Sequence, residues 1–131
     1  AAEGYIRTNN LPAAIALVNV TRARNGLDAI GSVASATAAY STNLATCVPR
    51  VPVAPNFTST ACGGLLEAMK YEKRIETAYT GYFIWFSDNR GWGDLVEGTP
   101  VEWPVPYQEM QARQKTYYNG TNRAPRGTYG F

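Results

Sequence analysis

A long helical pattern of apolar residues between Leu65 and Asn89 constrains the fold of this chain most. One apolar stripe recurs at helical spacing through Ala68, Tyr71, Ile75, Ala78, Tyr82 and Trp85. A second stripe runs through Leu65, Met69, Tyr79, Phe83 and Phe86 and is interrupted by Glu72 and Glu76. An apolar arc of this width predicts one long helix, ending at Gly91, that is covered on more than one side. Gly81 inside it indicates that another backbone passes close by.

A second helical region is predicted at the N-terminal end. Residues 1–9 read as a short helix, and Asn10 is placed to cap a following helix. Pro12 fits that helix because a missing N–H is tolerated in the first turn. Gly26 supplies the glycine typical of a helix end. Two helices joined by a tight turn form a helical hairpin, which is the unit of tetratricopeptide-like solenoids.

The remaining segments are predicted to be loops. Residues 28–64 are rich in Ala, Ser, Thr and Pro, and one short helix is expected there near Ala34–Asn43. Residues 92–131 are rich in Gly, Pro and aromatic residues. We therefore predict a mainly α fold in a single domain, residues 1–131. It combines a tetratricopeptide-like hairpin (1–27), a loop region (28–64), one long helix (65–91) and an irregular, aromatic-rich tail (92–131).

The two cysteines of the chain, Cys47 and Cys62, stand at the ends of a proline-rich stretch that reads as extended surface chain. A bridge that closes a loop of about fifteen residues would contribute roughly 3 kcal/mol on the chain-entropy estimate. We therefore predict a disulfide, and with it a compartment outside the cytoplasm. Two free thiols in a reducing cytoplasm are the alternative.

Composition excludes several classes of function. The chain has no histidine, which removes the commonest metal ligand and general base and leaves no Ser-His or Cys-His pair. A net charge of +2 with scattered basic residues argues against a nucleic-acid platform. No apolar run approaches the length of a membrane-spanning helix. We expect no metal and no cofactor.

Glu72 and Glu76 lie four residues apart and share one face of the predicted long helix. Paired carboxylates are the groups that glycoside hydrolysis requires, which gives this pair a catalytic alternative. Basic residues surround the pair, however, and the middle of a helix is poorly placed to reach a substrate. We therefore interpret Glu72, Arg74 and Glu76 as a structural network at a helix–helix contact, with Arg22 or Arg24 of the hairpin as a bidentate partner.

Aromatic residues are concentrated in the second half of the chain. Trp85 and Phe86 are predicted to be core residues of the long helix, although exposed rings could instead form a platform for sugars. The tail has too many aromatic residues for an isolated surface coat. We expect part of it, centred on Trp92, Trp103 and Tyr107, to contact another protein chain or a ligand.

Three patches of the sequence carry recognisable motifs. They are Ala2–Leu27, which ends in Asn19-x-x-Arg22-x-Arg24-x-Gly26-Leu27; Leu66–Leu95, which holds Glu72-x-Arg74-x-Glu76 and Trp85-Phe86; and Pro104–Glu109. Together these patches resemble the C-terminal region of the SusD/RagB family. The likeness departs at the aromatic pair, because Ile84 precedes it and Ser87-Asp88 follows it, where the family usually has Arg before and Asp-Leu after.

The SusD/RagB family consists of non-catalytic nutrient-binding lipoproteins on the outer membrane of Gram-negative bacteria. The resemblance implies a non-enzymatic binding module of the cell envelope, periplasmic or on the outer-membrane surface, that works with a membrane transporter to capture nutrients, including oligosaccharides. It also implies that the chain is the C-terminal part of a longer protein or a shortened relative. The family's glycan-binding segments lie N-terminal to this region, so no ligand residue is carried over. The alternative is an accessory structural subunit docked on the extracytoplasmic face of a larger membrane-protein complex.

Overall fold

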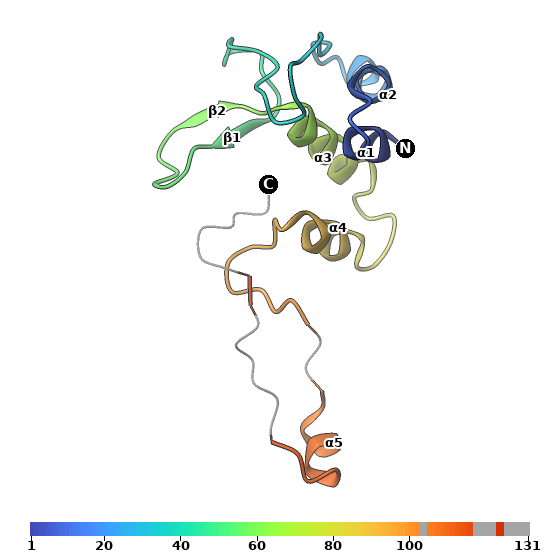
Figure 1. Cartoon of the computed structure of the whole chain (residues 1–131), viewed down its shortest axis with the longest axis vertical. Coiled ribbons are helices and arrows are strands. Elements are labelled where there is room, and N and C mark those ends of the chain that lie inside the picture. The colour runs from blue at the N-terminus through green and yellow to red at the C-terminus, as the bar shows by residue number, and fades with distance from the viewer. Residues whose placement is uncertain (103–104, 117–122, 125–131) are drawn as a thin grey trace. The chain divides into compact units, whose positions relative to one another are not determined.

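The computed structural model describes residues 1–102, 105–116 and 123–124 of the chain (Figure 1). The chain divides into two compact units, Ala1–Tyr82 and Phe83–Phe131. The first unit contains α1 (Ala2–Arg7), α2 (Leu11–Arg24), β1 (Arg50–Pro52), β2 (Thr60–Cys62) and α3 (Leu65–Glu76). The second contains α4 (Ile84–Trp92) and α5 (Tyr107–Ala112). The described residues are therefore rich in helix and include a small antiparallel sheet. The assignment of the whole chain to a single domain stays a prediction.

The predicted helical hairpin is formed by α1 and α2. The side chain of Asn10 accepts a hydrogen bond from the backbone N–H of Ala13 at 3.4 Å, which caps the start of α2. After α2, Gly26 adopts a left-handed backbone with φ 67°. The N–H of Leu27 then bonds the carbonyl oxygen of Arg22 at 2.9 Å, which completes the glycine-dependent helix end that the sequence indicated.

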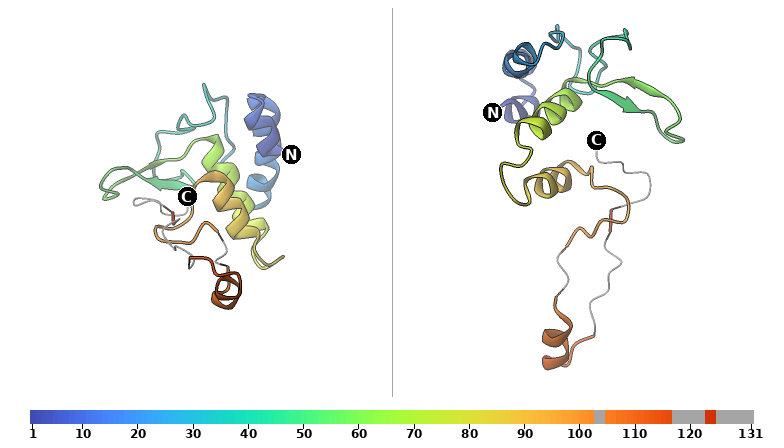
Figure 2. Two further views of the ribbon diagram at one scale, coloured as in Figure 1. Left: turned by 60° about the horizontal axis from the view of Figure 1, so that its bottom comes forward. Right: turned by 180° about the vertical axis from the view of Figure 1, so that it is seen from behind.

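The core of the first unit lies where the hairpin meets α3. Buried residues of α2, namely Leu11, Ala14 and Val18, are matched on α3 by Leu65, Ala68 and Met69. The three helices α1, α2 and α3 contact one another in pairs, and Figure 2 shows this arrangement from two further sides. The hairpin packs these buried residues of α2 on α3.

A disulfide between Cys47 and Cys62 closes the loop region against the start of α3, with a Cα–Cα distance of 5.7 Å. This pairing confirms the predicted bridge. Between the two cysteines, β1 and β2 form an antiparallel hairpin in which Arg50 faces Cys62 and Pro52 faces Thr60. The sequence analysis predicted an extended chain here but missed the pairing, because three prolines hid the strand signal.

The short helix expected near Ala34–Asn43 is not formed, so that prediction was wrong. This segment instead bonds the start of α3. The N–H of Leu66 donates to the carbonyl oxygen of Ala36 at 2.9 Å, and Ala39 forms a bridge with Gly64. A side chain on Gly64 would place its Cβ within 2.7 Å of the Ala36 carbonyl, so only glycine permits this approach.

The single long helix predicted between residues 65 and 91 was also wrong, because α3 ends at Glu76 and α4 begins only at Ile84. The intervening Thr, Tyr, Gly and Phe residues all have low helix propensity. Thr77 and Thr80 use their hydroxyls to bond the carbonyl oxygens of Lys73 and Thr77 at 2.7 and 2.8 Å. Tyr79 and Phe83 adopt left-handed backbones with φ 61° and 67°. Gly81 therefore lies in a turn and not in a helix.

The second unit begins with α4, which ends at the left-handed Gly93. Asn89 is fully buried and donates from Nδ2 to the carbonyl oxygen of Trp85 at 2.7 Å. Further along, the N–H of Ala124 bonds the carbonyl oxygen of Thr99 at 2.9 Å. The sequence analysis treated residues 92–131 as irregular and missed α5, a short helix whose weak signal is a proline before its first residue and an acidic first turn.

Candidate functional site between three helices

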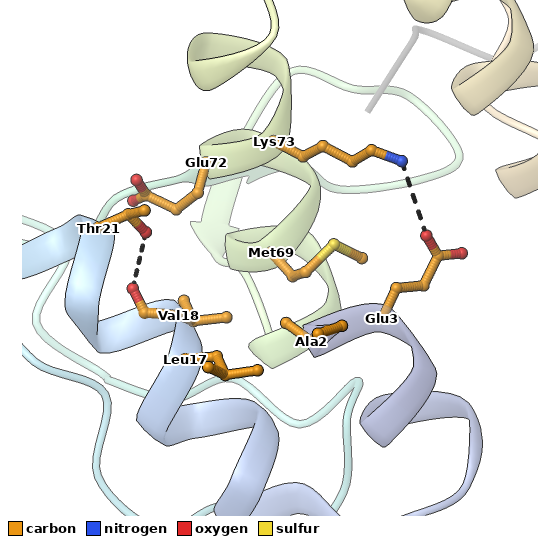
Figure 3. Close-up of a pocket in the computed structure, with 9 residues that line it drawn as sticks. Ala2, Glu3, Leu17, Val18, Thr21, Met69, Glu72 and Lys73 are labelled. Carbon is orange, nitrogen blue, oxygen red and sulfur yellow. Dashed lines mark hydrogen bonds and ion pairs between the residues drawn. The ribbon is translucent and has the colours of Figure 1, made fainter.

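The functional candidate in the first unit is a pocket of about 280 Å³ between α1, α2 and α3. We call it the three-helix pocket (Figure 3). Its apolar part comes from Ala2, Leu17, Val18 and Met69, and its polar part from Glu3, Thr21, Glu72 and Lys73. The view shows the apolar side chains gathered between the helices, with Thr21 and Glu72 on one side of them and Glu3 and Lys73 on the other. This lining suits an apolar group flanked by hydrogen-bonding groups.

Two helices fix the rim of the pocket by charge. Nζ of Lys73 on α3 lies 3.9 Å from Oε2 of Glu3 on α1, and Oε1 of Glu3 pairs with Arg7 at 2.7 Å. On the α2 side, Oγ1 of Thr21 donates to the carbonyl oxygen of Val18 at 2.8 Å. Both ion pairs are partly exposed and add little stability, so the value of the Lys73–Glu3 contact is in positioning α1 on α3.

Glu72 connects the pocket to a buried cluster around Arg22. The Arg22 guanidinium is fully buried, and its NH1 lies 3.6 Å from Oε1 of Glu72. Its Nε donates to the carbonyl oxygen of Asp28 at 2.7 Å and NH1 to that of Val48 at 2.6 Å. NH2 donates to the hydroxyl of Tyr40 at 3.1 Å. These five residues form what we call the Arg22 cluster.

Tyr40 completes the Arg22 cluster from the loop region. The guanidinium carbon of Arg22 lies 5.1 Å from the centre of the Tyr40 ring, within the range of a cation–π contact. The Tyr40 hydroxyl donates to the Val48 carbonyl at 2.8 Å and accepts from the Val48 N–H at 2.7 Å. Because Val48 follows Cys47, the disulfide and the Arg22 cluster hold the same turn of chain.

The residues of the predicted glutamate and arginine network lie on facing helices of the first unit. Arg22 pairs with Glu72, and NH1 of Arg24 lies 3.9 Å from Oε2 of Glu76 in a partly exposed pair. Arg74 lies half-buried on α3. Glu72 is buried beside an arginine and Glu76 is exposed beside another, so the two carboxylates have different environments.

The predicted aromatic residues of α4 and α5 belong to the second unit. Trp85 and Phe86 lie on α4 in the second unit, and Trp85 is 48% exposed. The prediction that Trp85 is a buried core residue was therefore wrong, since it assumed a continuous helix. Trp92 is half-buried at the end of α4, Tyr107 is exposed at the start of α5, and Trp103 lies outside the described residues.

The partners that complete the site carry little signal in the sequence. Tyr40, Asp28 and Val48 come from a loop without periodicity, and two of them act through backbone carbonyls that any residue type supplies. Leu17 is exposed beside the buried Val18, which marks the side of α2 where the pocket opens.

Among the residues that the structure describes, no group of His, Cys, Asp and Glu side chains could hold a metal ion. In the same residues, no helix has both the length and the apolar character needed to cross a membrane. Comparison of the chain with protein-family models, curated proteins and solved structures found no match.

Proposed function

We propose that this chain is a non-enzymatic binding module of the bacterial cell envelope that works by docking on another protein chain. The proposal includes the SusD/RagB resemblance. In it, the α1–α2 hairpin and α3 together act as a tetratricopeptide-like docking unit. The three-helix pocket is the observation that carries it.

The size and lining of the pocket favour a protein partner. At about 280 Å³ the pocket is just below the roughly 300–1,000 Å³ typical of small-molecule sites. It therefore suits one apolar side chain of a partner better than an oligosaccharide. Leu17 is 40% exposed where it lines the pocket, so a partner could bury further apolar area there. Apolar anchors in small pockets carry much of the energy of protein interfaces.

The carboxylates near the pocket support a non-catalytic role. A general acid needs contact with substrate, whereas Glu72 is buried against the Arg22 guanidinium. Glu3 is held at the rim between Arg7 and Lys73. The chain has no histidine to act as a base in their place. The disulfide supports a place outside the cytoplasm, where such bridges persist.

These features fit best an accessory structural subunit docked on a larger membrane-protein complex. Nutrient capture beside an outer-membrane transporter is the second candidate, and fully exposed aromatic rings favour it. Tyr79 and Tyr82 present their rings to solvent after α3, and flat rings of this kind stack on sugars. Tyr107 is a third exposed ring, on α5.

A pair of matched substitutions on α2 tests the docking role. Leu17→Glu places a charge in the three-helix pocket, whereas Val20→Glu places the same charge on an exposed position of the same helix that does not line it. In cells that make the protein, a tagged wild-type chain should co-purify with its complex from envelope fractions. Leu17→Glu should reduce recovery about tenfold or more, and Val20→Glu should leave it close to the wild-type level.

Equal loss in both variants, or recovery of the wild-type chain only as a free monomer, would contradict docking through this pocket. Stoichiometric recovery in a large complex supports the accessory subunit. Oligosaccharide binding that is lost on Tyr79→Ala and Tyr82→Ala would support capture.

A further inference from the structure

A second cavity, of about 670 Å³, lies within the second unit and is unrelated to the docking role. We call it the α4 cavity. Three of its lining residues, Phe86, Ser87 and Arg90, follow one face of α4 at helical spacing, and Phe83 lines it from the position just before the helix. Val101 and Glu102 line it from the chain beyond the helix. Its volume falls in the range of small-molecule sites, unlike that of the three-helix pocket.

Arg90 is the polar group that is already positioned in this cavity. Its Nε donates to the carbonyl oxygen of Val101 at 2.7 Å, which fixes the guanidinium between the two walls. Among the described residues this is the hydrogen bond that Arg90 makes, so its NH1 and NH2 groups remain for a ligand. Two parallel N–H donors match the two oxygens of a carboxylate.

The backbone is strained at the apolar part of the α4 cavity. Phe83 is 60% exposed and adopts a left-handed conformation with φ 67°, which is unusual for a bulky residue. Strained residues of this kind persist where the surrounding structure holds them, and they cluster at ligand sites. Phe86 and Val101 are half-buried, so the three side chains offer an apolar wall beside Arg90.

Glu102 limits the charge that the α4 cavity accepts. Its carboxylate lines the same space as Arg90, so a second negative charge on the ligand would be repelled. This argues against phosphates and dicarboxylates. We propose that the α4 cavity binds a small monocarboxylate with an apolar or aromatic body. The carboxylate pairs with NH1 and NH2 of Arg90, and the body packs on Phe83 and Phe86.

The test is a titration of the isotope-labelled full chain with N-acetylphenylalanine, followed by amide chemical shifts. Saturable shifts centred on the six lining residues are expected, with a dissociation constant in the millimolar range because the ligand is small. The matched amide, N-acetylphenylalaninamide, lacks the carboxylate and should bind about tenfold more weakly. Arg90→Gln should weaken binding of the acid by a similar factor.

Arg113→Gln is the control, because Arg113 is an exposed arginine of the same unit that pairs with Glu109 and does not line the cavity. It should leave binding unchanged. Unaltered amide shifts of the buried Leu95 and Ala124, which are remote in sequence from residue 90, establish that Arg90→Gln is folded. If they change, Phe83→Ala takes its place and should also weaken binding, because the apolar wall of the cavity then loses a ring that is 60% exposed.

Three results would overturn the proposal. They are equal binding of the acid and the amide, shifts centred away from the cavity, and no binding of the acid up to roughly 10 mM. Binding of inorganic phosphate or of a neutral pyranose at these residues, without binding of the acid, would also reject the assigned ligand class. None of these results depends on whether the three-helix pocket docks a partner.

Discussion

The two units of this chain use their arginines in opposite ways. In the first unit, Arg22 is fully buried, and each of its three nitrogens donates to the loop region, at Asp28, Val48 and Tyr40. In the second unit, Arg90 is exposed and donates once to the backbone of Val101. A buried guanidinium holds segments in place, whereas an exposed and oriented one can meet a ligand. Among the described residues, the first unit therefore uses its arginine as an internal connection, whereas the second presents Arg90 at its surface.

The largest effect is expected from Arg22→Met. The change removes the donors to Asp28 and Val48 and leaves Glu72 buried without its opposite charge. Breaking a buried pair on one side costs about 3–5 kcal/mol. Amide exchange read residue by residue should show loss of protection in α2 and α3. The three tryptophans, all beyond Tyr82, should report little change in the second unit by fluorescence.

A double variant separates the charge from the packing. Arg22→Met with Glu72→Leu removes both charges and replaces them with apolar side chains of similar volume. It should be clearly more stable than Arg22→Met alone, since replacing both members of a buried pair is often neutral. Equal loss of protection in both units on Arg22→Met would contradict the comparison, because the two units would then unfold together.

A smaller effect is expected when the disulfide is removed by Cys47→Ser with Cys62→Ser. The sequence separation of 15 predicts that the free energy of unfolding falls by roughly 3 kcal/mol on the chain-entropy estimate. Part of the loss should appear at the Arg22 cluster, because Val48 follows Cys47. The wild-type chain should therefore have different denaturation midpoints with and without reductant, whereas the variant should have the same midpoint in both conditions. A reductant-independent wild-type midpoint would show that the loop is held by the Arg22 cluster alone.

Local signals in the sequence were enough for part of this fold. Asn10 and Gly26 marked the ends of α2, and the two cysteines were paired as expected. The long helix was wrong because the apolar stripes continue in sequence through Thr77–Phe83, while the backbone does not. Low helix propensity and two threonine side chains that bond the backbone outweighed the periodicity there.

The candidate site was less accessible from sequence for a physical reason. The arginine and glutamate pair could be predicted, because charges spaced along two apolar helices must find partners. Tyr40 could not, since its role depends on where a loop without periodicity crosses the helices. The α4 cavity depends on Val101 reaching Arg90 through a backbone carbonyl, and no residue type encodes that contact. Such sites become visible only when the path of the chain is known.

The smallest effect is expected from Trp85→Ala in the second unit. A buried tryptophan would cost about 3–5 kcal/mol, but a side chain that is 48% exposed should cost about 1 kcal/mol or less. The carbonyl oxygen of Trp85 that accepts from Asn89 belongs to the backbone and is retained.

Asn89→Ala is the matched comparison on the same helix, because Asn89 is fully buried. Loss of its side chain should lower the free energy of unfolding by about 1–3 kcal/mol. Protection of the Leu95 amide against exchange measures both variants without relying on tryptophan emission. If Trp85→Ala proves the more damaging of the two, the indole is covered in solution, and the second unit has a core of its own comparable to the Arg22 cluster. If the predicted order holds, the stability of the second unit rests on Asn89 and not on its aromatic rings, which leaves those rings available for a partner or ligand.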